Sequence, residues 1–174
     1  AALHTQRVDG GLVSHWALDN GAELNGRASL TATQLERTFG TQRVASTQTT
    51  AFAEETLGGN TRGHGWIVGV AFNLDELAAP TVPGVSYHYT VPAVLVQDEV
   101  APTSWLKLAG SARFDVHSDF GTFFSPRLSA LFRQPGSSWS LRASFGGGFS
   151  APTPFVDEIE TTSLATLLPM RGLR

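Results

Sequence analysis

The sequence predicts an all-β fold, an antiparallel up-and-down transmembrane β-barrel with about eight strands in the chain. Polar and apolar residues alternate along several segments of about 9–12 residues, the length of a tilted strand that crosses a membrane. In the segments with the clearest alternation, nearly every charged side chain falls on the polar face, with Asp98 as the main exception. Short connections tend to alternate with longer ones along the chain, an asymmetry typical of membrane barrels.

Composition limits the class of protein. The chain has 174 residues, the size of one ordinary domain, and its net charge is −3 with dispersed basic residues, so no nucleic-acid surface is indicated. The absence of cysteine leaves no disulfide framework and no cysteine-based metal site. No apolar run approaches the roughly 20 residues of a membrane-spanning helix. The start lacks a signal sequence and the end lacks a strand pattern, so we expect a fragment of a larger protein.

The first predicted hairpin has the cleanest alternation in the chain. Its first segment, residues 7–18, places Val8 and other large apolar residues on one face and charged residues on the other. Asn20 and Gly21 follow, and both accept the positive φ that a tight hairpin turn requires. Residues 22–33 then alternate strictly between apolar and polar, which predicts the second strand.

The middle of the chain is less uniform. A longer polar connection over residues 36–43 leads to a third segment, 44–57, whose threonines favour a strand but whose faces the pattern does not resolve. The proline-containing stretch 74–89 is expected to be a long loop. Strands with clear alternation are expected in residues 66–72, 91–100 and 106–117.

The last predicted hairpin joins residues 123–133 to 139–145 through a turn at residues 134–138. In both of its strands the apolar side chains share one face, while arginines and serines take the other. Tryptophans near strand ends on the apolar side are expected to form a girdle where the barrel meets the membrane surface. They are Trp16, Trp66, Trp105 and Trp139.

Three stretches of the C-terminal half carry a family resemblance. Residues 106–115 (LKLAGSARFD), 124–131 (FSPRLSAL) and 141–153 (LRASFGGGFSAPT) resemble, in order and spacing, the barrel domain of TonB-dependent outer-membrane receptors. Ser150 departs from the family pattern, which often has Arg there. The resemblance implies that residues 1–174 are part of a barrel of about 22 strands, with the plug domain and the C-terminal strands absent.

The resemblance also implies a function. Such receptors lie in the bacterial outer membrane and take up a scarce nutrient, such as a ferric siderophore or cobalamin, with energy from TonB acting on the plug. The expected partners are outer-membrane lipid, the plug domain, TonB and a small nutrient chelate, and no enzyme activity or cofactor is expected. Two alternatives stay open: a small complete outer-membrane barrel with a structural or adhesive role, and a soluble β-barrel binding protein.

The candidate ligand-binding residues are Tyr87, His88 and Tyr89, which the sequence places in the long external loop. Aromatic side chains can stack on a flat chelate, so this group is the best chemical match to a ligand. Arginines on the polar face are expected to point into the lumen, where plug contact and hydration are favoured over ligand binding. They are Arg113, Arg127, Arg133 and Arg142.

Other residue groups have structural interpretations. His117 and Asp119 lack metal-ligand spacing and are expected to be solvated residues at a strand end. The glycines of residues 146–148 have no helix after them and no lysine partner, so they suit bending or close backbone approach, not phosphate binding. The acidic residues of the loop that follows are expected to be hydrated, not hydrolytic. They are Asp157, Glu158 and Glu160.

Overall fold

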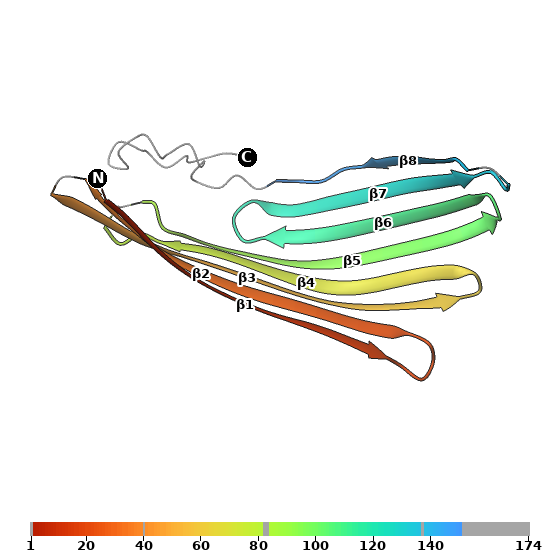
Figure 1. Cartoon of the computed structure of the whole chain (residues 1–174), viewed down its shortest axis with the longest axis horizontal. Helices are drawn as coiled ribbons and strands as arrows, with labels where there is room; N and C mark the ends of the chain where they lie inside the picture. Colours follow the sequence, from red (N-terminus) through yellow and green to blue (C-terminus); the bar gives the residue numbers. More distant parts are fainter. Residues whose placement is uncertain (1, 40, 82–83, 137, 151–174) are drawn as a thin grey trace.

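Eight strands follow one another in a single antiparallel sheet. The computed structural model describes residues 2–39, 41–81, 84–136 and 138–150, and each strand in it pairs with the next along the chain (Figure 1). The strands are β1 (Ala2–Ala17), β2 (Glu23–Phe39), β3 (Gln42–Thr61), β4 (His64–Ala78), β5 (Tyr87–Thr103), β6 (Leu106–His117), β7 (Gly121–Arg133) and β8 (Ser140–Gly146). The predicted all-β, up-and-down architecture is confirmed, as an open sheet. Among the described residues, no helix is long and apolar enough to cross a membrane.

The pairing register gives the sheet one apolar and one polar face. Directly paired residues of antiparallel strands point to the same side, so the faces can be followed across the sheet. Leu24, Leu57 and Val68 lie in one such row. The apolar face consists of well-exposed side chains, among them Val70, Val94, Leu128 and Phe145.

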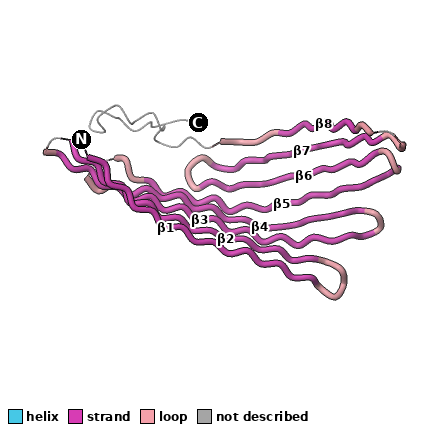
Figure 2. Tube along the Cα trace, viewed as in Figure 1, coloured by secondary structure: helices cyan, strands magenta, loops and turns pink. Residues whose placement is uncertain are grey.

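The sheet is curved (Figure 2), and the contact between Arg113 and Glu54 indicates that it curls toward its polar face. Ala71 and Ala93, which lie opposite each other on β4 and β5, are only 6% exposed although the sheet has a single layer. Arg113 on β6 reaches Glu54 on β3, three strand spacings away, or about 14 Å in a flat sheet. Small side chains in the middle of the polar face therefore allow the flanking strands to bring longer side chains together above them.

The turns after β1, β3, β5 and β7 lie at one end of the sheet (Figure 1). At the first of these turns Gly21 has a φ of 78°, as predicted, but Asn20 does not have a positive φ. Five residues, 18–22, separate β1 from β2, so the tight two-residue turn that the Asn-Gly pair predicts does not form. All four tryptophans lie in or beside these turns, and Trp105 stacks on Phe132 of the apolar face at 6.1 Å. The predicted placement of tryptophans near strand ends is confirmed.

The predicted alternation of short and longer connections is wrong in two places. β2 runs to Phe39 and β3 begins at Gln42, so most of the connection expected over residues 36–43 is strand. Only three residues, 118–120, join β6 to β7, and the longest connection between the eight described strands spans residues 79–86. Polar residues in these stretches continue the strands, because inter-strand hydrogen bonds satisfy the backbone N–H and C=O groups whether the side chains are polar or apolar.

Candidate functional site on the polar face

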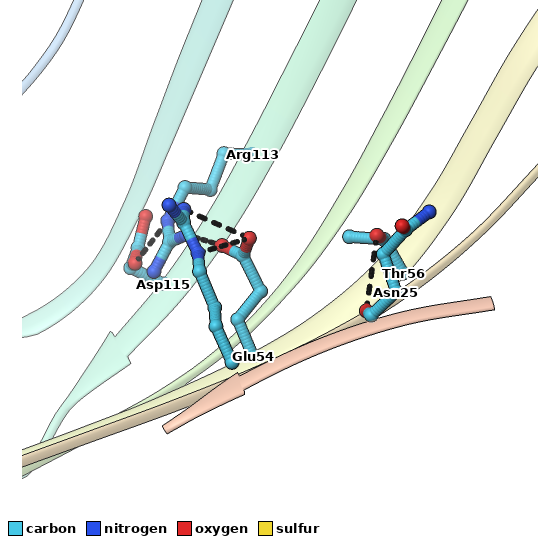
Figure 3. Close-up of polar contacts among 6 residues, drawn as sticks. Asn25, Glu54, Thr56, Arg113 and Asp115 are labelled. Carbon is cyan, nitrogen blue, oxygen red and sulfur yellow. Dashed lines mark hydrogen bonds and ion pairs between the residues drawn. The ribbon is translucent and has the colours of Figure 1, made fainter. Parts of the chain in front are cut away.

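An ion network links distant strands across the polar face (Figure 3). Glu54 on β3 accepts a hydrogen bond from Arg27 Nε on the neighbouring β2 at 3.0 Å, and Arg27 Nη2 forms an ion pair with the same oxygen at 2.9 Å. The Arg27 guanidinium also lies 5.2 Å from the ring centre of Phe52, a cation–π distance. Nearby, the Thr56 hydroxyl donates to the Asn25 carbonyl at 3.3 Å. The Glu54 side chain is only 14% exposed, so the acidic partner of the pair is largely shielded from water while Arg27 is not.

Arg113 extends this network to β6. Its Nη1 lies 3.8 Å from Glu54 Oε2, and its Nε donates to Asp115 Oδ1 at 2.8 Å. Arg113 and Asp115 are two residues apart on one strand, so their side chains share the polar face. Positive and negative side chains alternate along this network, in the order Arg27, Glu54, Arg113 and Asp115. Each charge therefore lies next to one of opposite sign, which stabilises the four charges on one surface.

Asp115 is the most buried charged residue described, at 3% exposure. Its Oδ1 is bonded to Arg113, but its Oδ2 has no hydrogen-bond partner among the described residues. Asp115 lines a hollow of about 480 Å³ together with Asp75, Tyr89 and Phe149. A buried carboxylate oxygen without a donor carries a desolvation cost, and the bond from Arg113 to the other oxygen offsets part of it.

An aromatic cluster borders the hollow. Tyr87 and Tyr89 stack at 4.7 Å, and Tyr89 contacts the rings of His117 at 5.0 Å and Phe120 at 5.8 Å. The Tyr87 hydroxyl lies 3.3 Å from both carboxylate oxygens of Asp75 and donates to that group. Planar rings and carboxylates thus meet at one end of the polar face.

The predicted ligand group, Tyr87, His88 and Tyr89, does not lie in a loop. These are the first three residues of β5, paired with Leu77, Glu76 and Asp75 of β4. Because strand residues alternate, Tyr87 and Tyr89 lie on the polar face while His88 lies on the apolar face, 3.5 Å from Glu76. The prolines that indicate the loop lie within residues 79–86, and the β ladder starts directly after it.

The structure contradicts some of the other predictions for residue groups and confirms others. His117 is 4% exposed, and its Nδ1 lies 3.1 Å from the backbone N of Asp119, so the expectation of a solvated histidine is wrong. Among the described residues, no three His, Asp or Glu side chains gather in a way that could hold a metal ion. Close backbone approach is confirmed at Gly146, where a Cβ would lie 3.0 Å from the Pro126 carbonyl oxygen. Asp157, Glu158 and Glu160 lie outside the described residues.

The four arginines that the sequence predicts in the lumen divide into two classes. Arg113 has two acidic partners on the sheet itself, whereas Arg127, Arg133 and Arg142 form no ion pair with any described residue. By register, all four lie on the predicted polar face. Sequence reasoning missed Glu54 and Asp115 as network members. The alternation around Asp115 gives its face, but no local signal indicates its burial.

Charges also occur on the apolar face. Glu55 lies there in one row between Gly26 and Val70, inside the apolar band. Two further carboxylates lie near the ends of the band, each close to a histidine on the paired strand: His64–Asp98 (2.8 Å) and His88–Glu76 (3.5 Å). Of these three carboxylates on the apolar face, Glu55 is the one that forms no ion pair with the described residues.

Comparison with known proteins identifies the family. A protein-family model described as "TonB dependent receptor-like, beta-barrel" matches residues 3–161, most of the chain. The chain belongs to this family. A comparison with curated proteins finds no match.

Solved receptor structures share the fold of this TonB-dependent receptor barrel. The siderophore receptor PirA from Pseudomonas aeruginosa is similar, with a TM-score of 0.76 and 21% identity over 86% of this chain. The ferric enterobactin receptor PfeA, in complex with BCV-L6, has a TM-score of 0.75 and 14% identity over 87% of this chain. This chain spans 28% and 26% of those two proteins.

Proposed function

We propose that the chain is a β-barrel segment of an outer-membrane receptor for active transport of a scarce nutrient, such as a ferric siderophore or cobalamin. The observation that carries this proposal is the division of the sheet into an exposed apolar face and a polar face with an ion network. The apolar face contacts lipid, and the polar face lines the lumen. A soluble barrel would fill its interior with apolar side chains, and the concave face here is polar.

The proposed receptor is larger than this chain. β1 and β8 pair only with β2 and β7 among the described residues, so the eight strands do not close into a small complete barrel. Residues 1–174 are proposed to form part of the barrel domain, with the plug domain and the remaining strands elsewhere in the protein. TonB acts on the plug in this scheme and supplies the energy.

The proposed orientation places the tryptophan-bearing turns in the periplasm and residues 79–86 outside the cell. Membrane barrels have aromatic girdles at their interfaces and shorter periplasmic turns, and four of the turns in this sheet carry or adjoin a tryptophan. Tyr87 and Tyr89 then lie toward the outer opening of the lumen and contact the ligand, while His88 faces away from it.

Transport by the full-length protein tests the proposal. Cells that express it as their only such receptor should accumulate radioactive iron from at least one ferric chelate, or labelled cobalamin, under nutrient limitation. Accumulation should stop in a strain that lacks TonB, and an empty vector provides the control. Uptake that is unchanged without TonB, or a folded protein that is monodisperse without detergent, would contradict the proposal.

A further inference from the structure

Two arginines on the polar face of β7 and β8 line a second, smaller hollow. Arg127 and Arg142 both line this basic hollow of about 240 Å³, together with Lys107 and Glu99. Lys107 Nζ lies 2.6 Å from Glu99 Oε1, so the acidic side chain of this lining is already paired. Arg127 and Arg142 are exposed, and neither forms a hydrogen bond or an ion pair with a described residue. The basic hollow therefore presents two accessible guanidinium groups that lack an anion.

The strands beside Arg127 supply no acidic partner for it. Arg127 lies opposite Ser111 of β6 and Gly146 of β8, so both directly paired residues are small and uncharged. The diagonal neighbours on β6, which long side chains can also reach, are Ala109 and Arg113. The sheet around Arg127 thus leaves its charge unbalanced, and the open space in front of this side chain is the proposed lumen.

The size and position of the basic hollow select the kind of anion. Sites for drug-sized molecules have about 300–1,000 Å³, so this hollow suits a single anionic group and not a whole chelate. A guanidinium matches a carboxylate in shape and can donate two parallel hydrogen bonds to it. Lys107 is the second residue of β6 and follows a turn that we propose to be periplasmic. The hollow then lies at the inner end of the lumen, away from the outer opening.

We propose that the basic hollow holds a carboxylate side chain of the plug domain, an aspartate or glutamate that pairs with Arg127 and Arg142. The proposal rests on the proposed function, which supplies a plug domain in the lumen. It adds that the plug surface facing β6–β8 is acidic and that this contact positions the plug against the barrel wall. Two guanidinium groups that are solvated in the open sheet become paired when the plug is in place.

Carbodiimide coupling tests the pairing, because it joins an amine to a carboxylate in contact with it, with loss of water. Arg127→Lys places an amine in the basic hollow of the full-length receptor in detergent. Mass spectrometry should then show residue 127 linked to an aspartate or glutamate of the plug domain. The Lys107–Glu99 link should form in every sample, which checks the chemistry. Arg62→Lys, exposed in the turn between β3 and β4 at the same end of the sheet, should give no link to the plug.

A second variant, Arg142→Lys, covers the case in which Arg127→Lys does not fold, and it should link to the same plug residue. Charge reversal gives an independent readout. In Arg127→Glu, hydrogen exchange in the linked plug peptide should be at least tenfold faster, whereas Arg62→Glu should leave it unchanged.

Three results would overturn the inference: links from the basic hollow to barrel strands alone, no new link in a sample that shows the Lys107–Glu99 link, or unchanged exchange in Arg127→Glu. If TonB-dependent uptake persists alongside any of them, the proposed function stands. Absence of all TonB-dependent uptake would instead overturn the proposed function itself.

Discussion

Glu54 and Glu55 are adjacent in sequence but lie on opposite faces, so the same substitution should have opposite effects. Glu54→Gln removes the charge that pairs with Arg27 at 2.9 Å and with Arg113 at 3.8 Å. Hydrogen bonds to charged groups contribute about 1.5–3 kcal/mol when shielded, and exposed pairs contribute less than about 1 kcal/mol. Since Glu54 is 14% exposed but Arg27 is 62% exposed, we expect a loss of about 1–3 kcal/mol.

Glu55→Gln should be neutral or stabilising. The apolar band on β4 runs from Trp66 to Glu76, and Glu55 pairs with Val70, well inside it. A lysine or arginine at mid-membrane costs about 2–4 kcal/mol and an acidic residue less, so removal of the charge should gain about 1 kcal/mol. The two variants then differ by about 2–4 kcal/mol, or roughly 30- to 1,000-fold in the folding equilibrium.

Reversible urea unfolding of the full-length protein in phospholipid vesicles, followed by tryptophan fluorescence, measures both variants under one condition. Each changes one oxygen to a nitrogen, so the pair controls for size and for position along β3. A double variant should show the sum of the two effects, because the side chains do not share a face. Two losses of equal size would refute the assignment of the faces.

Two further outcomes follow from the faces and the backbone. Leu128→Arg, on the apolar face, should destabilise the full-length protein by about 2–4 kcal/mol in vesicles, whereas Ser129→Arg, its neighbour on the polar face, should change stability by less than about 1 kcal/mol. Equal costs would contradict the lipid contact. Gly146→Ala should lower the unfolding midpoint, because its Cβ would press on the Pro126 carbonyl, while Gly148→Ala enters open space and serves as the control. A Gly148 variant that is the less stable of the two would contradict the close approach.

The hairpins and their faces could be predicted because the information is local. A two-residue period fixes which side chains share a face, and Asn20-Gly21 fixes where the first turn lies. The structure has Trp16 opposite Leu24 as the alternation requires, whereas a two-residue turn at Asn20-Gly21 would pair Trp16 with Asn25. The alternation, not the turn signal, therefore gives the β1–β2 register. The same logic gives the apolar face of β6 and β7.

The third strand could not be resolved from its own residues. Around Glu54 and Glu55, β3 has threonines, alanines and two adjacent carboxylates, so the two faces differ little in polarity. Only pairing with β2 and β4 decides the matter, and it places Phe52 on the polar face and Glu55 on the apolar face, against the local hydropathy. Register, not side-chain preference, determines the faces of this strand.

The candidate site was also beyond sequence reasoning, because it depends on the curl of the sheet. Arg113 and Glu54 are far apart in the sequence, and their contact requires that the strands between them carry small residues such as Ala71 and Ala93. Asp115 is buried by the same curvature. An alternating pattern gives a side chain its face, and only the long-range shape of the sheet gives it neighbours on that face.

The length of the apolar band on β4 relates the proposed membrane position to the hollow that Asp115 lines on the polar face. Ten residues separate Trp66 from Glu76 on β4, which corresponds to about 33 Å along the strand. With a tilt of about 40°, this gives roughly 25 Å across the membrane, the height of the apolar band in outer-membrane barrels. Tyr89 pairs with Asp75, next to the upper end of that band, and Asp115 lies nearer the middle. In the proposed orientation, the end of the hollow that Tyr89 lines therefore lies toward the outer membrane surface, and the end that Asp115 lines lies deeper.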